Sequence, residues 1–292
     1  LNNANSYLRF DAEVTVGSVS VNVAGNSGRG LKIKQSSTIG SLTVTANTEL
    51  SIYSGKSLSG AITLATGSIK LNKTGTLASS VSMSGGTLDA DESSTVSGDL
   101  TQTADITIDV ADGKILTYSG AALSVGANTL TISGGGSLVS GGLTLDNADS
   151  KLLLNSITLD NVSTSANSLG IDVDGNSTVT SLSVGHTTPV SIADGKTLSG
   201  AITVSAGGSI KLDETGTLAS TIAMSGGTLD ADKTLTLSGA LSHTADITID
   251  VKADETLTYS GAAVSLGAYT LTLSGGGRFS NTNHLDLNNA SS

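Results

Sequence analysis

The chain has 292 residues with no cysteine, no tryptophan, one proline and 36 glycines, and its formal net charge is −11. The absence of cysteine excludes a disulfide framework and any thiolate chemistry. With only 14 Lys and Arg residues, the composition argues against nucleic acid or an anionic membrane as a partner, and no apolar run has the length of a membrane span.

The predicted elements are short β-strands that recur along the whole chain. Pairs of apolar residues separated by one residue return every 18 to 24 residues, most often every 19. In the first half the pairs are Leu8/Phe10, Leu31/Ile33, Leu50/Ile52, Ile69/Leu71, Leu88/Ala90, Ile106/Ile108 and Leu130/Ile132. In the second half they are Leu152/Leu154, Ile171/Val173, Val190/Ile192, Ile210/Leu212, Leu229/Ala231, Ile247/Ile249 and Leu271/Leu273. This alternation, with Gly, Ser, Asn and Asp between the pairs, is typical of strands and turns.

A longer repeat encloses these strands. SGGTLDAD at 84–91 returns at 225–232, and ADITIDV at 104–110 returns at 245–251, both at an offset of 141 residues. The segment LNNA at the start of the chain also resembles the segments that begin at Leu145 and Leu287. The sequence therefore predicts two tandem repeats of about 143 residues, at 1–144 and 145–286, and the start of a third at 287–292.

Inward-facing apolar residues that return about every 19 residues predict an all-β fold, a parallel β-helix or β-solenoid of about 14 turns. Successive turns would stack about 4.8 Å apart. One turn buries too few apolar side chains to offset its conformational entropy, so each turn depends on its neighbours. A narrow interior also explains the scarcity of aromatic residues.

Strings such as SGGTLDAD and GKTLSGAITV, in turns rich in Gly, Ser, Thr and Asn, resemble the β-helical stalks of bacterial surface proteins. The family is the filamentous-haemagglutinin and autotransporter-passenger group of adhesins. The resemblance implies a right-handed β-helix, an extracellular or cell-surface location, and a role in adhesion or as a fibre.

We therefore expect a non-enzymatic structural segment of a long extracellular fibre or cell-surface stalk. Its partners would be further copies of the same repeat along the fibre axis. The alternative is an adhesin passenger whose rod displays receptor-binding or polysaccharide-binding contacts. A catalytic function is disfavoured because the three histidines lie far apart in sequence and do not recur with partners in the two repeats.

Acidic residues form a predicted column. If the apolar pairs stack in register, the residue three past the first member of each pair lines up on consecutive turns: Asp213, Asp232 and Asp250, matched in the first repeat by Asn72, Asp91 and Asp109. Carboxylates about 5 Å apart repel one another unless water or a cation screens them. One hypothesis is that the column binds Ca²⁺, which prefers oxygen ligands. The alternative is an exposed acidic strip with no cofactor.

The same register predicts ion pairs between neighbouring turns. Lys70 would lie beside Asp89, and Lys211 beside Asp230. Because both repeats contain the pair, it is a candidate for fixing the register between turns.

One charge reversal distinguishes the repeats. Lys32 and Lys34 of the first repeat correspond to Asp172 and Asp174 of the second. Opposite charges on equivalent turns suggest that neighbouring rods associate laterally.

Overall fold

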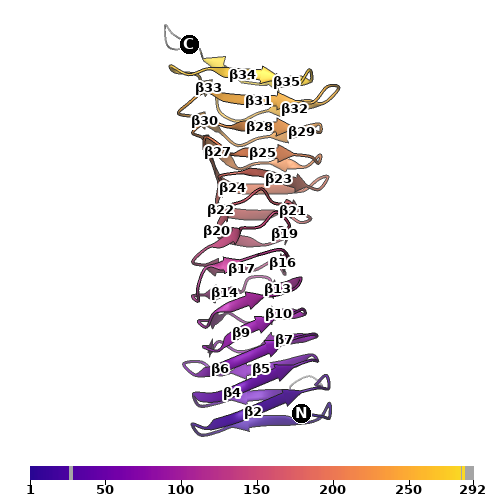
Figure 1. The fold of residues 1–292 in the computed structure, drawn as a ribbon, viewed down its shortest axis with the longest axis vertical. Helices are drawn as coiled ribbons and strands as arrows, with labels where there is room; N and C mark the ends of the chain where they lie inside the picture. Colours follow the sequence, from indigo (N-terminus) through magenta and orange to yellow (C-terminus); the bar gives the residue numbers. More distant parts are fainter. Residues whose placement is uncertain (26–28, 284, 287–292) are drawn as a thin grey trace. The chain divides into compact units, whose positions relative to one another are not determined.

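The computed structural model describes residues 1–25, 29–283 and 285–286, and the chain divides into two compact units, Leu1–Leu143 and Thr144–Ser292. Every regular element in the described part is a β-strand, and each unit is a parallel β-solenoid of seven turns (Figure 1). The predicted fold, a β-solenoid of about 14 turns in all, is confirmed. The predicted third repeat at 287–292 lies outside the described residues.

Each turn contributes one strand to a first parallel sheet. In unit 1 these strands are β1 (Tyr7–Phe10), β3 (Gly30–Ile33), β5 (Thr48–Ile52), β7 (Ser68–Leu71), β10 (Thr87–Ala90), β13 (Ile106–Val110) and β16 (Thr129–Ser133). In unit 2 they are β19 (Lys151–Asn155), β21 (Gly170–Val173), β23 (Thr187–Ile192), β25 (Ser209–Leu212), β28 (Thr228–Ala231), β31 (Ile247–Val251) and β34 (Leu271–Ser274).

The remainder of each turn supplies a second parallel sheet, either as one long strand or as two short ones. In unit 1 its strands are β2 (Thr15–Val21), β4 (Ser37–Val44), β6 (Ser57–Leu64), β8 (Thr76–Leu77), β9 (Ser80–Met83), β11 (Ser94–Val96), β12 (Leu100–Gln102), β14 (Ile115–Tyr118), β15 (Leu123–Ser124) and β17 (Ser137–Ser140). In unit 2 they are β20 (Thr158–Thr164), β22 (Ser177–Val184), β24 (Thr197–Val204), β26 (Thr217–Leu218), β27 (Thr221–Met224), β29 (Leu235–Leu237), β30 (Leu241–His243), β32 (Thr256–Tyr259) and β35 (Arg278–Asn281). Strand β18 (Leu143–Leu145) lies at the division between the units, and β33 (Val264–Ser265) pairs separately with β36 (Leu285–Asp286).

The long strands bend at a glycine. Between β4 and β6 the register shifts between Ile39 and Ser41, opposite Gly60. Gly60 has a φ of +121°, and a β-carbon there would lie 1.7 Å from the carbonyl oxygen of Ile39. Only glycine fits this bend, which turns the chain from one part of the sheet to the next.

The core is a stack of aliphatic side chains. In unit 1, Leu31, Leu50, Ile69 and Leu88 are at most 1% exposed. The predicted apolar pairs are buried except at the ends of the series, where Leu8 and Leu271 are half-buried and Leu273 is exposed. The interior of each unit is therefore filled by the alternating residues that the sequence pattern indicates.

Candidate functional site

Charged residues concentrate on one sheet. The first-sheet strands carry eleven charged residues, whereas the second-sheet strands described above carry two, Asp160 and Arg278. The outer face of the first sheet is therefore the place where charged groups of successive turns meet.

A polar ladder crosses four consecutive turns of unit 1. Lys70, Asp89, Asp109 and Ser133 lie opposite one another on β7, β10, β13 and β16. The Nζ atom of Lys70 is 3.3 Å from Oδ2 of Asp89 and 2.9 Å from Oδ2 of Asp91. At the other end, the Ser133 hydroxyl donates a hydrogen bond to Asp109. The predicted placement of Lys70 beside Asp89 is confirmed.

Unit 2 contains the same ladder. Lys211, Asp230, Asp250 and Ser274 lie opposite one another on β25, β28, β31 and β34, as predicted for Lys211 and Asp230. The Nζ atom of Lys211 is 2.7 Å from Oδ2 of Asp232, and the Ser274 hydroxyl donates to Asp250. The same links between turns therefore recur in both units.

Burial distinguishes the carboxylates of the ladder. Burial raises the pKa of Asp89, with the Asp91 carboxylate adding to the rise and Lys70 opposing it. Burial likewise raises the pKa of Asp230, and the Asp232 carboxylate adds to it. The hydrogen bond from Lys211, in contrast, lowers the pKa of Asp232. Lys211 therefore stabilises the charge of Asp232 more than that of the more buried Asp230.

The register corrects the predicted acidic column. Asp250 lies opposite Asp230, not Asp232, and Asp109 lies opposite Asp89, not Asp91. The reason lies in the register of β31 against β28 and of β13 against β10. In both cases the paired residue lies two positions further along the chain than the spacing of the apolar pairs predicts. A shift of two residues leaves every side chain on the same face of the sheet, so the hydrophobic pattern does not distinguish the two registers.

The remaining members of the predicted column have partners on neighbouring turns. Asp213 accepts a hydrogen bond from the Ser191 hydroxyl at 2.7 Å, whereas Asp91 and Asp232 bind the lysines. Within the described ranges, no group of three or more His, Cys, Asp or Glu side chains is arranged to hold a metal ion. Calcium binding on this face stays an untested hypothesis beside the alternative of an exposed acidic strip with no cofactor.

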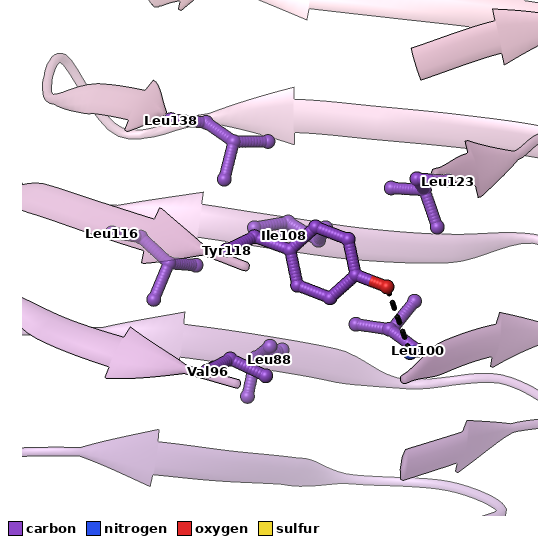
Figure 2. A pocket seen from close by; sticks show the side chains of 8 residues that line it. All are labelled: Leu88, Val96, Leu100, Ile108, Leu116, Tyr118, Leu123 and Leu138. Carbon is purple, nitrogen blue, oxygen red and sulfur yellow. Dashed lines mark hydrogen bonds between the residues drawn. The ribbon is translucent and has the colours of Figure 1, made fainter. Parts of the chain in front are cut away.

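A small void lies inside unit 1 around Tyr118 (Figure 2). Its volume is about 10 Å³, and it is lined by Leu88, Val96, Leu100, Ile108, Leu116, Tyr118, Leu123 and Leu138. The Tyr118 hydroxyl accepts a hydrogen bond from the backbone N–H of Leu100 at 3.1 Å (Figure 2). A space of this size is at the limit for one water molecule and its lining is otherwise apolar, so it is a packing feature and not a ligand site.

Unit 2 fills the corresponding space with an aromatic ring. Tyr259 accepts the same hydrogen bond, from Leu241 N–H at 3.1 Å, and stacks on Phe279 with ring centroids 6.2 Å apart. Phe279 pairs with Leu257 as Leu138 pairs with Leu116. The repeated segment LTYSGAA was the available sequence signal for this tyrosine, but the alternating pattern did not show that its hydroxyl would bind backbone.

A second polar cluster lies at the first turns of unit 1. Arg9 and Lys32 are opposite each other on β1 and β3, and the Nζ atom of Lys32 lies 5.4 Å from the centre of the Tyr7 ring. Lys34 lies 5.7 Å from the centre of the Tyr53 ring. We call Tyr7, Arg9, Lys32, Lys34 and Tyr53 the basic–aromatic face. Sequence reasoning identified the two lysines but missed their aromatic neighbours, because the contacts depend on register between turns about 20 residues apart.

Comparisons with protein family models, with curated proteins and with solved structures found no match to this chain. In the part of the chain that the structure describes, no helix has the length and apolarity needed to cross a membrane.

Proposed function

We propose that this chain is a structural repeat segment of a long extracellular fibre or cell-surface stalk, without enzymatic activity. The observation that supports it best is the duplicated polar ladder. In each unit, one lysine, two aspartates and one serine lie opposite one another on four successive turns. All four residues belong to strands of the first sheet.

The ladder suits a scaffold because its groups contact one another between turns. A half-exposed ion pair contributes only a fraction of a kcal/mol, so the ladder adds little to stability. Its effect is on register: a strand that slipped by one residue would place its charged side chains in the core and separate Lys70 from Asp89. The backbone hydrogen bonds between parallel strands, which run from turn to turn, would carry tension along the axis of each unit.

An adhesin passenger is the second candidate. The basic–aromatic face favours it, because that face occurs in one unit only and the scaffold does not require it.

Single-molecule pulling on the full chain, held at its two ends, tests the scaffold proposal. We expect extension in steps of whole turns, each releasing about 20 residues or roughly 65–70 Å of chain. Replacing both ladder lysines (Lys70→Met and Lys211→Met) should lower the force of these steps. The matched control replaces Lys56 and Lys196 with Met. These two lysines occupy equivalent positions in the two units and lie outside the ladder.

Two results would contradict the proposal. One is a chain that extends smoothly at low force, without steps. The other is an unchanged force profile when Lys70 and Lys211 are replaced. If these variants unfold at the same force as the control pair, the ladder has no mechanical role.

A further inference from the structure

The two units differ at all five positions of the basic–aromatic face. These positions lie on β1, on β3, and directly after β3 and β5. The counterparts of Tyr7, Arg9, Lys32, Lys34 and Tyr53 in unit 2 are Lys151, Leu153, Asp172, Asp174 and Ala193. The buried positions on the same strands stay apolar in both units, as with Ile33 and Val173. Unit 2 therefore shows that the solenoid folds without these surface side chains.

Cations lie over both aromatic rings of this face, and the neighbouring Arg29 adds a further cation at Tyr7. The Tyr7 side chain is 48% exposed, and Arg29 and Lys32 lie 5.3 Å and 5.4 Å from the centre of its ring. Arg9 and Lys34 share the carboxylate of Asp11, so the face keeps an excess of positive charge within an acidic chain. Such a surface attracts anions and also offers apolar ring surface.

A groove opens beside the face. Tyr7 lies opposite Gly30, and Gly30 lies opposite Glu49, where a β-carbon on the glycine would lie 2.2 Å from the carbonyl oxygen of Glu49. The groove has a volume of about 260 Å³ and is lined by Gly25, Asn47, Thr48, Glu49, Ser68 and Lys70. Polar and charged residues of β5 and β7 therefore line this hollow, one turn beyond the strand that carries Lys32.

One residue that lines this groove has a buried hydroxyl without a partner. Thr48 is 5% exposed, and its Oγ1 atom makes no hydrogen bond within the described structure. The equivalent Thr188 of unit 2 donates to the hydroxyl of Thr164 at 3.2 Å. Unit 1 has Val21 at the position of Thr164, since each is the last residue of its second-sheet strand, β2 or β20, and lies opposite the last valine of the next strand. An unsatisfied buried hydroxyl is costly, and of the equivalent residues Thr48 and Thr188 only Thr48 lacks a partner.

We propose that unit 1 binds an anionic polysaccharide, with carboxylate or sulfate groups, across the basic–aromatic face and its groove. Arg9, Lys32 and Lys34 would bind the anionic groups, Tyr7 would pack against a sugar ring, and the polar groups that line the groove would bind sugar hydroxyls. The binding site goes beyond the scaffold function and does not depend on it.

Retention of the full chain on immobilised polysaccharides tests the proposal, with polygalacturonate for carboxylates, heparin for sulfates and dextran as the neutral comparison. The variant K32D/K34D introduces the residues that unit 2 already carries, so the fold is expected to tolerate it. It should weaken binding about tenfold or more, the size of one lost charge-assisted contact. The control K56D/K73D makes the same change in net charge outside the face and should weaken binding by less than about twofold.

A second pair of substitutions separates fold stability from sugar recognition. Val21→Thr gives Thr48 the partner that Thr188 has in unit 2. We expect it to raise Tm without changing polysaccharide binding, while Tyr7→Leu weakens binding with little effect on Tm.

Three outcomes would overturn the proposal. Equal retention on polyphosphate, unaffected by Tyr7→Leu, would show a charged patch with no sugar recognition. Binding to vesicles of phosphatidylserine and phosphatidylcholine in preference to either polysaccharide would indicate a lipid surface. Loss of self-association in K32D/K34D, without any change in polysaccharide retention, would support the lateral contact between rods instead.

Discussion

Asp89 and Asp109 lie directly opposite each other on β10 and β13, so two carboxylates face one another on adjacent strands. Lys70 lies on one side of this pair and Ser133 on the other. Like charges in this arrangement repel, and the lysine and the hydroxyl offset that repulsion at the two ends of the ladder. Because Lys70 lies closer to Asp91 than to Asp89, the buried carboxylate is the least compensated member.

The substitution Asp89→Asn should therefore raise Tm at neutral pH. Burial gives Asp89 a higher pKa in the folded chain than in the unfolded chain. The folded state then binds the proton more tightly, so the free energy of unfolding falls as the pH rises through the window between the unfolded and the folded pKa. Thermal unfolding followed by circular dichroism at several pH values measures the difference. The Tm of Asp89→Asn should exceed that of the unchanged chain at pH 7, and the difference should disappear at pH values below the ordinary pKa of aspartate.

Asp232→Asn provides the comparison with the opposite sign. The hydrogen bond from Lys211 lowers the pKa of Asp232, so its contribution is present above the ordinary aspartate pKa and is lost as the pH falls through the folded value. This variant should lower Tm at pH 7. If both substitutions moved Tm in the same direction, the assignment of the buried and the outer carboxylate would be wrong.

Calcium should have no effect on Tm. Three of the four carboxylates that the register pairs, Asp89, Asp109 and Asp250, already contact a lysine or a serine, so a cation would have to displace these partners. Thermal unfolding with Ca²⁺ and with a chelator should give the same midpoint. A rise in Tm with Ca²⁺ that is lost in Asp109→Asn and Asp250→Asn would establish a calcium site instead.

Gly60→Ala should destabilise unit 1 by about 3 kcal/mol or more, since the new β-carbon meets a carbonyl oxygen and the backbone φ is positive. Gly17→Ala is the matched control, because a β-carbon there has nothing within 4 Å. Urea unfolding of the two variants measures the difference. Equal midpoints would mean that the bend opposite Ile39 does not require glycine.

Tyr118→Phe should cost about 1–3 kcal/mol, because it leaves the buried N–H of Leu100 without its acceptor. Tyr269→Phe is a suitable control, since Tyr269 is 40% exposed. Hydrogen exchange of the Leu100 amide gives a local readout, and it should accelerate in Tyr118→Phe alone. An unchanged exchange rate would mean that the Tyr118 hydroxyl does not stabilise the backbone of this turn.

The alternating pattern was sufficient to predict the solenoid and the placement of Lys70 beside Asp89 and of Lys211 beside Asp230, although Lys211 forms its ion pair with Asp232. Leu88 and Ala90 follow Ile69 and Leu71 at the common spacing of 19 residues, so Lys70 and Asp89 fall into register. It failed at β13, where Ile106, Ile108 and Val110 are all buried and two registers satisfy the same alternation. The acidic column was predicted wrongly for this reason.

The basic–aromatic face and the orphan hydroxyl could not be predicted in the same way. Tyr7 and Lys32 belong to different turns, and their contact depends on side-chain conformation as well as on register. The missing partner of Thr48 depends on Val21, which lies in a different sheet. Alternation identifies which side chains face inward, but not which of them meet across the interior.

Immunogold electron microscopy of the cells that produce this chain tests the proposed role most directly, with antibodies raised against the folded chain. The account predicts gold particles along filaments or stalks outside the cell envelope. Labelling confined to the cell interior would contradict it.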